Sequence, residues 1–200
     1  MNPLNSVRGT IIGGVLVAIV IAALIGGVGF HHAQLDRWLH VISGVLWIGL
    51  LYYFNFVQVP ALAVAAGDEG GPGGAGITKY VAPLALAWFR WAALATWLSG
   101  AYYLMVNGNL IGAFTLGLGG GTVNPYQLVI GLGAWMGTIM LFNVWVLIWP
   151  NQKKVLGMVE ASDAEKASAK RTAFLASRTN TLLSFPMLMC MTGAVHGLPF

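Results

Sequence analysis

The chain has few charged residues and a single cysteine. Only 8% of its 200 residues are Asp, Glu, Lys or Arg, whereas a soluble domain carries about 25%. Because 58% of the residues are hydrophobic, the composition predicts an integral membrane protein. Cys190 has no second cysteine to pair with, which excludes an internal disulfide, and the chain has no Cys-x-x-Cys-His motif, which excludes covalent attachment of a c-type haem.

Five apolar segments are long enough to cross a membrane, which takes about 20 helical residues for about 30 Å of hydrocarbon. They cover residues 10–29, 38–62, 81–106, 127–149 and 179–197. The predicted fold is an all-α bundle of about five transmembrane helices that forms a single membrane domain over residues 1–200.

The basic residues predict the orientation of this bundle. With a cytoplasmic N-terminus, Arg37 lies outside, Arg90 lies within a span, and the other basic residues lie inside: Arg8, Lys79, Lys153, Lys154, Lys166, Lys170, Arg171 and Arg178. By the positive-inside rule, the C-terminus is then periplasmic, in a multi-pass protein of the bacterial inner membrane. This topology explains the net charge of +4, so we expect no nucleic-acid partner.

The stretch 151–178 is polar and contains a helix start signal. Ser162 and Glu165 have the spacing of a capping box, in which each side chain bonds to a free backbone amide at the start of a helix. This spacing predicts a helix from about residue 163. We expect it to be a cytoplasmic surface helix held by anionic membrane lipid, with a docking surface for a partner as the alternative.

Two histidines in apolar segments predict a cofactor site. His40 lies about one turn inside the second span, and His196 lies near the end of the fifth; the predicted topology places both in the outer leaflet. Ionisable side chains in a membrane usually have a function, and imidazole is the commonest metal ligand. We expect His40 and His196 to hold a b-type haem or a metal ion between them, with a solvated interfacial histidine as the alternative for His196.

The residues around His40 form one helical stripe. Steps of three or four residues join His40, Gly44, Trp47, Leu51, Asn55 and Gln58. We expect this stripe to face inward, with Trp47 beside the cofactor and Gly44 leaving room for a flat macrocycle. The alternative for Gly44 is a small residue in a helix contact.

Two arginines are candidate partners for an anion. Arg90 lies near the middle of the third span, where an arginine costs roughly 2.5–3.5 kcal/mol on insertion scales and must be paired. We expect its partner to be an anion such as a haem propionate or an anionic substrate, or else carbonyl groups together with Asn55, Asn143 or water. Arg37, one turn before His40, is a simpler candidate for a propionate.

Copper is the main alternative to haem. Met187, Met189, Cys190 and Met191 lie within one stretch of the fifth span, and thioether or thiol ligands favour cuprous copper. Methionine is also an ordinary filler of apolar cores, and Met187 and Met189 do not share a helix face.

Three segments carry a resemblance to a known family. These are residues 38–58 (WLHVISGVLWIGLLYYFNFVQ), 89–91 (FRW) and 177–188 (SRTNTLLSFPML). Together they resemble the membrane domain of bacterial membrane-bound urate hydroxylases, the urate oxidase N-terminal domain. The shorter pattern His-x-x-x-Gly-x-x-Trp-x-Gly also resembles a helix of copper-resistance D proteins and of haem-binding membrane protoporphyrinogen oxidases.

The resemblance implies a redox protein of the inner membrane. In urate hydroxylases a C-terminal cytochrome c domain follows the membrane part, and this 200-residue sequence does not include one. We therefore expect a protein that binds haem b and passes electrons towards a separate cytochrome c, with oxidation of a urate-like substrate as an open question. The second hypothesis is a non-catalytic accessory subunit of a larger respiratory or photosynthetic membrane complex, and the third is a copper-binding membrane protein.

Overall fold

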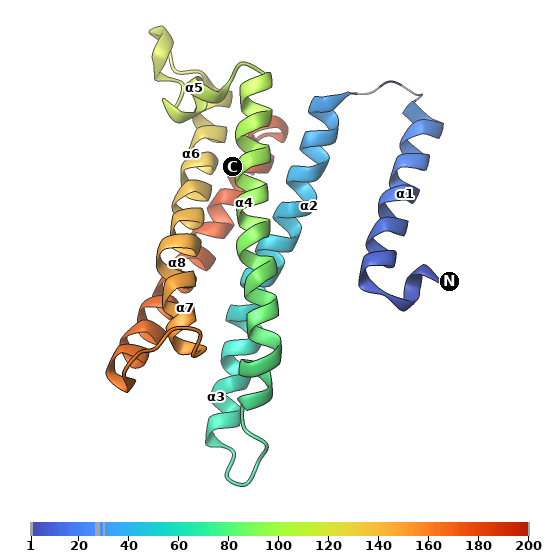
Figure 1. Cartoon of the computed structure of the whole chain (residues 1–200). Coiled ribbons are helices and arrows are strands. Elements are labelled where there is room, and N and C mark those ends of the chain that lie inside the picture. The colour runs from blue at the N-terminus through green and yellow to red at the C-terminus, as the bar shows by residue number, and fades with distance from the viewer. Residues whose placement is uncertain (1, 27–28, 30, 200) are drawn as a thin grey trace. The chain divides into compact units, whose positions relative to one another are not determined.

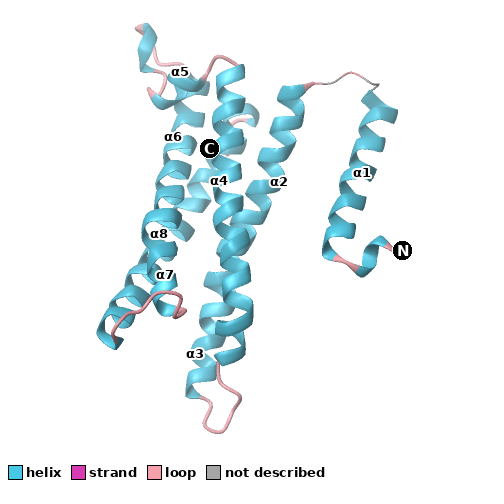
Figure 2. Cartoon of the chain, viewed as in Figure 1, coloured by secondary structure: helices cyan, strands magenta, loops and turns pink. Residues whose placement is uncertain are grey.

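The computed structural model describes residues 2–26, 29 and 31–199, and every regular element in these residues is helical (Figure 2). The chain forms two compact units, Met1–Leu35 and Asp36–Phe200, which are considered separately. The predicted all-helical fold is therefore confirmed for the described residues.

The first unit is built around α1 (Val7–Gly26). Asn2 caps a short 3-10 helix, Pro3–Asn5, by accepting a hydrogen bond from the amide of Leu4. None of the residues of α1 is buried within its own unit, and its apolar run has a mean hydropathy of 2.5. The span predicted over 10–29 thus starts earlier in the structure, and residues 27–28 of that prediction lie outside the described residues.

The second unit contains long helices joined by short connections (Figure 1). Its elements are the end of α2 (His32–Tyr52), α3 (Val59–Gly67), α4 (Ala82–Val106), α5 (Leu110–Phe114), α6 (Pro125–Phe142), α7 (Trp149–Val155) and α8 (Asp163–His196). Three π-helical segments, Tyr53–Gln58, Ile77–Val81 and Asn143–Ile148, continue directly into α3, α4 and α7.

Each π-helical segment ends two residues before a proline. The segments end at residues 58, 81 and 148, and the prolines are Pro60, Pro83 and Pro150. A proline inside a helix lacks an amide donor, and its ring clashes with the carbonyl four residues earlier. That carbonyl lies within the π-helical segment in all three cases, so the wider turn accommodates the proline without ending the helix.

Four helical stretches are long and apolar enough to cross a membrane by length and composition. They are Val7–Gly26, His32–Gly67, Ile77–Val106 and Pro125–Val155, and they correspond to the first four predicted spans. The fifth predicted span, 179–197, forms the second half of α8, which is not among the four. This half contains the buried polar residues Asn180, Thr181 and Ser184, which lower its hydropathy.

The capping box predicted at Ser162 is present. The Ser162 hydroxyl accepts from the amide of Glu165 at 3.3 Å, and the amide of Ser162 donates to the Glu165 carboxylate at 2.8 Å. The helix that begins there continues to His196 without a break. The predicted surface helix and the predicted fifth span are therefore one helix. It packs on α7, and Ala169 and Ala173 in its first half are buried.

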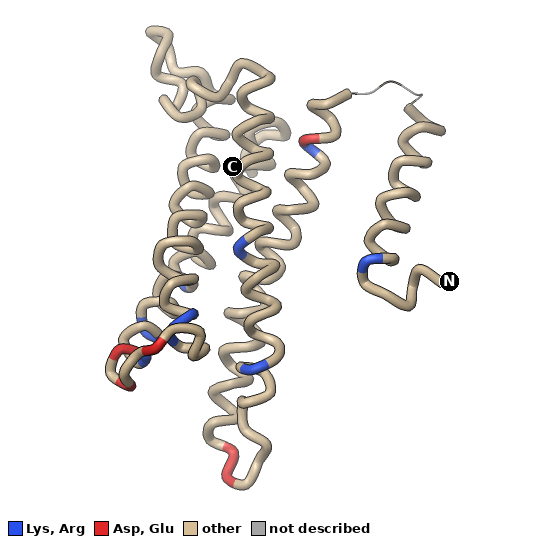
Figure 3. The backbone as a smooth tube through the Cα atoms, viewed as in Figure 1, with Lys and Arg blue, Asp and Glu red and all other residues tan. Residues whose placement is uncertain are grey.

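The core of the second unit lies between the second span, α4, α6 and α8. Its largest fully buried side chains include Leu51, Phe89 and Met140. Phe54 meets Phe89 edge to face with ring centroids 5.5 Å apart, which joins the second span to α4. Charged residues are sparse along the long helices, and several of them gather around the α7–α8 connection (Figure 3).

Candidate functional site between α2 and α4

The stripe predicted on the second span faces inward. Trp47, Leu51, Asn55 and Gln58 are buried, and His40 and Gly44 are half-buried. On the other side of the same helix, Val41 and Val45 are 55% and 70% exposed. The periodicity prediction for this helix is therefore confirmed, and His40 and Gly44 face α4.

His40 is held by the backbone of α4. Its Nδ1 lies 2.8 Å from the carbonyl oxygen of Thr96 and 3.4 Å from the hydroxyl of Ser99. A carbonyl only accepts hydrogen bonds, so Nδ1 carries the proton and donates it. Nε2 then keeps its lone pair, which is the arrangement found in metal-binding histidines, where the second ring nitrogen donates to a carbonyl or a carboxylate.

The carbonyl of Thr96 also lies within reach of a hydroxyl of its own helix. The hydroxyl of Ser99 lies 3.1 Å from it and 2.7 Å from the carbonyl of Ala95, and the hydroxyl of Thr96 bonds back to the carbonyl of Ala92 at 2.7 Å. Such bonds from Thr and Ser to the carbonyl four residues earlier tend to bend a helix. The imidazole of His40 therefore joins a cluster of hydroxyl and carbonyl groups on one face of α4.

Gly100 makes room for the imidazole ring. A Cβ atom at this position would lie 2.8 Å from Cε1 and 3.0 Å from Nδ1 of His40, which is closer than real Cβ contacts allow. Gly44, by contrast, faces the Thr96 methyl group, and a Cβ there would meet it at an ordinary 3.7 Å. Gly44 thus lies in the α2–α4 contact, as in the helix-packing alternative.

Thr96, Ser99 and Gly100 were not identified from the sequence. The sequence signal was the short run Thr96 to Gly100, which places two hydroxyl residues and a glycine on one face of an otherwise apolar span. A helix face of this kind is also common in membrane helix packing. The position of His40 opposite this run distinguishes a histidine-binding face from an ordinary helix-packing face.

The structure places His196 apart from this constellation. His196 is the last residue of α8 and is exposed, and so are Thr192, Met189 and Phe185, which precede it at helical spacing. The buried face of α8 instead carries Ser184, Met187, Cys190 and Gly193. Within the described residues no contact joins His196 to His40, and the joint ligation of one haem stays a prediction.

The arginines also have defined environments. Arg37 is exposed on α2, one turn before His40. The guanidinium of Arg90 lies over the ring of Trp149, with Cζ 3.7 Å from the ring centroid. The amides of Asn55 and Asn143, which were candidate partners of Arg90, donate instead to Ser177 and Asn180 at 2.8 Å each.

These amides belong to a buried polar network that connects the second span, α6 and α8. Asn180 accepts from Asn143 and donates to the carbonyl of Met140 at 3.0 Å. Tyr52 and Ser184 are joined through their hydroxyls at 2.9 Å. Asn55 and Asn143 both lie in π-helical segments, and such segments are frequent at functional sites.

Three buried polar atoms near this network have no hydrogen-bond partner within the described residues. They are Nε1 of Trp47, Oε1 of Gln58 and Nε1 of Trp145. An unpaired polar atom in a core costs about 1–3 kcal/mol, so such atoms commonly mark a bound water or ligand. Trp47 and Gln58 belong to the same stripe as His40, which is where the sequence predicted a cofactor.

The sulfur residues of α8 are divided between its two faces. Met187 and Cys190 are buried, whereas Met189 is 38% exposed. Cys190 and Met191 pack against Gly133 of α6, where an added Cβ would lie 3.2 Å from Cβ of Cys190 and 3.1 Å from Cε of Met191. Cys190 and Met191 therefore take part in the α6–α8 contact, and copper binding stays a prediction.

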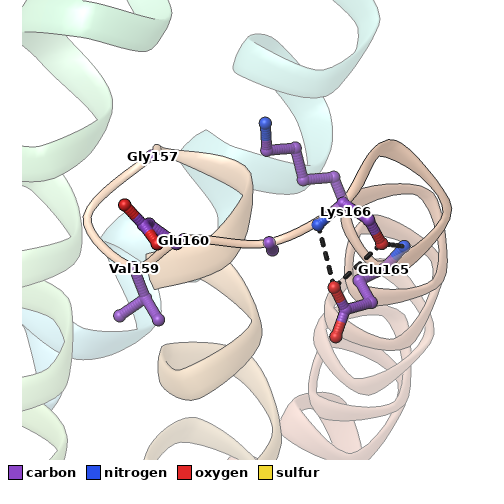
Figure 4. A pocket seen from close by; sticks show the side chains of 7 residues that line it. Gly157, Val159, Glu160, Glu165 and Lys166 are labelled. Atoms are coloured by element: carbon purple, nitrogen blue, oxygen red, sulfur yellow. Dashed lines mark hydrogen bonds between the residues drawn. The ribbon is translucent and has the colours of Figure 1, made fainter.

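A surface depression lies elsewhere, in the α7–α8 connection. It has a volume of about 650 Å³ and is lined by Gly157, Val159, Glu160, Glu165 and Lys166 among others (Figure 4). Ser162 and Glu165, which form the capping box, are among the residues that line it. None of the candidate cofactor residues lines it.

One family model matches the C-terminal part of the chain. The family model described as urate oxidase N-terminal matches residues 126–200. The match spans 75 of the 200 residues, which is less than half of the chain. The matched residues cover α6, α7 and α8, and they include the segment 177–188 on which part of the resemblance rests, while the segments 38–58 and 89–91 lie outside the match.

No curated protein and no solved structure matches the chain. The partial match agrees with the resemblance over residues 126–200, and the assignment of a cofactor depends on the residues of this chain. Among them, the imidazole of His40 with its defined proton is the group best suited to ligation.

Proposed function

We propose that the chain is a membrane redox protein in which His40 binds a b-type haem through Nε2 and from which electrons pass towards a cytochrome c. The observation that carries the proposal is the hydrogen bond from Nδ1 of His40 to the carbonyl of Thr96. It holds the ring in one tautomer and one orientation, as ligating histidines require. When bound, a haem supplies a one-electron carrier.

The remaining residues have supporting parts in this proposal. Trp47 has a buried Nε1 without a protein partner, and Gly100 fixes the place of the ring. Arg37 is near enough along α2 to meet a propionate. His196 is proposed as the second ligand, and its exposure at the end of α8 makes it the part of the site that most needs a direct test.

The proposed location is the bacterial inner membrane, with the N-terminus in the cytoplasm and the C-terminus in the periplasm. The distribution of basic residues supports this orientation. It would place the His40 end of the bundle on the side where a periplasmic cytochrome c is reached.

The test is a reduced-minus-oxidised spectrum of the full chain in mild detergent, together with a pyridine haemochrome assay. We expect a stoichiometric b-type signal in the wild type, its loss in His40→Ala, and its retention in the matched control His31→Ala, which removes an exposed histidine nine residues earlier. An unchanged spectrum in His40→Ala would rule out His40 as the ligand.

His196→Ala separates two forms of the proposal. Loss of the signal, or a shift from a low-spin to a high-spin spectrum, would identify His196 as the second ligand. An unaltered spectrum would leave His40 as the only one of the two that ligates, with a coordination position open to a substrate. If the wild type carried neither haem nor copper, the accessory-subunit hypothesis would replace this proposal.

A further inference from the structure

Arg90 has an unusual environment for a cation in a membrane-spanning helix. It is half-buried, and within the described residues its guanidinium makes neither a hydrogen bond nor an ion pair with a carboxylate. Its contact with Trp149 is a cation-π interaction, with Cζ 3.7 Å from the ring centroid. Stacking on a ring leaves the five N–H donors of the guanidinium available to an anion.

A second cation meets the same ring. Nζ of Lys153 lies 5.9 Å from the centroid of Trp149, so α4 and α7 each bring one positive charge to this tryptophan. Two like charges close to one ring repel each other unless an anion lies near both. The arrangement therefore favours a bound anion.

The acidic residues near the end of α7 are engaged elsewhere or exposed. Glu165 bonds to Ser162 and interacts with the charge of Lys154, and Asp163 lies 3.9 Å from Lys166. Glu160 is exposed in the α7–α8 connection. A carboxylate of the described chain thus does not neutralise the pair formed by Arg90 and Lys153.

Trp149 lies near one end of its candidate span. It is followed by about six more residues of its span, which ends at Val155; this corresponds to roughly 9 Å of helix. Tryptophan is enriched at this level of the membrane, and a planar guanidinium suits the geometry of a phosphate. We propose that Arg90, Lys153 and Trp149 form a binding site for the phosphate of an anionic phospholipid.

The test is the lipid that remains bound to the purified full chain. After extraction from membranes in mild detergent, mass spectrometry of the bound lipids should show an anionic phospholipid retained in preference to phosphatidylethanolamine. Arg90→Gln and Lys153→Gln should each lower its amount about five- to tenfold. Lys170→Gln, which removes the same charge from an exposed position of α8, should leave it unchanged.

A second measurement is independent of what is carried through the purification. Phosphatidylglycerol added to delipidated wild type should raise the midpoint of thermal unfolding, while phosphatidylcholine and inorganic phosphate at the same concentration should not. Lys153→Gln, at a half-buried site near the end of α7, should fold and lose the response to phosphatidylglycerol.

Three results would overturn the proposal. One is equal retention of anionic lipid by the wild type and both variants. Another is an equal effect of inorganic phosphate, which would indicate a general anion site. The third is loss of haem from Arg90→Gln with lipid retention unchanged, which would make the guanidinium a propionate partner; the spectrum of His40→Ala tests haem binding separately.

Discussion

Gly100 of α4 and His40 of α2 are packed so closely that a methyl group at residue 100 would crowd the imidazole. The added Cβ would lie 2.8 Å from Cε1 of His40. An alanine at residue 100 would therefore require the ring, which donates through Nδ1 to the carbonyl of Thr96, to move.

The first prediction concerns this contact. Gly100→Ala should displace the ring, break the bond to Thr96 and destabilise the protein by about 1–3 kcal/mol, with loss of any haem held by His40. Gly44→Ala is the matched control, because its Cβ would make an ordinary 3.7 Å contact. Chemical unfolding in mixed micelles, with the haem content of each variant, measures both effects; equal stability of the two variants would contradict the prediction.

The second prediction concerns the buried amide pair of α8 and the π-helical segment after α6. Asn180→Ala leaves Nδ2 of Asn143 and the carbonyl of Met140 without their partner, which should cost about 1–3 kcal/mol. A double-mutant cycle with Asn143→Ala should give a coupling free energy of at least about 0.5 kcal/mol. Thr192→Ala, on the exposed face of the same helix, should have little effect; additive effects of the two asparagine variants would show that the pair is not coupled.

The third prediction concerns pH and the start of α8. Hydrogen bonds from Ser162, followed by the charge of Lys154, hold the pKa of Glu165 below its usual value of 4.5. A carboxylate with a lowered pKa stabilises the folded state at pH values above the unfolded pKa, and this contribution is lost as the pH falls through the folded pKa. Helix stability should therefore decrease below about pH 4.5, as followed by circular dichroism during thermal unfolding.

Glu165→Gln should reduce this pH dependence, and Glu160→Gln, in the connection before the helix, should not. The first variant keeps the size of the side chain but removes the charge that the capping box stabilises. The same decline with pH in the wild type and in Glu165→Gln would assign the effect to other carboxylates.

The fourth prediction concerns orientation. In a Cys190→Ala background, a cysteine at Thr122, in the loop before α6, should react with a membrane-impermeant maleimide in intact spheroplasts. A cysteine at Ser168, exposed on α8, should react only after the membrane is opened. The reverse pattern would invert the topology and would place the candidate site on the cytoplasmic side.

Local sequence signals predicted much of the secondary structure. The apolar runs gave four of the long helices because their length and hydropathy depend only on neighbouring residues. The Ser162 to Glu165 spacing gave the start of α8, since a capping box closes within one turn. The stripe from His40 to Gln58 gave the inward face of the second span, since a helix repeats every 3.6 residues.

The effect of the prolines depended on the tertiary structure. The helices continue through a widened turn before Pro60, Pro83 and Pro150 instead of ending there. A proline in the sequence shows where the regular backbone hydrogen bonds of an α-helix are interrupted. Whether the helix ends or widens depends on whether packing on neighbouring helices holds both sides in line.

The candidate site itself depended on the tertiary structure. His40 was identified from the sequence as an ionisable residue in a span, but its partners are 56 residues or more away on α4, and which carbonyl accepts its proton depends on how α2 packs against α4. The same holds for Arg90, whose partner Trp149 lies on another helix. The sequence by itself determined which segments are helical and which residues are chemically unusual in an apolar environment, because composition and helical periodicity are local properties. Only the packing of helices distant in sequence decided which of those residues meet.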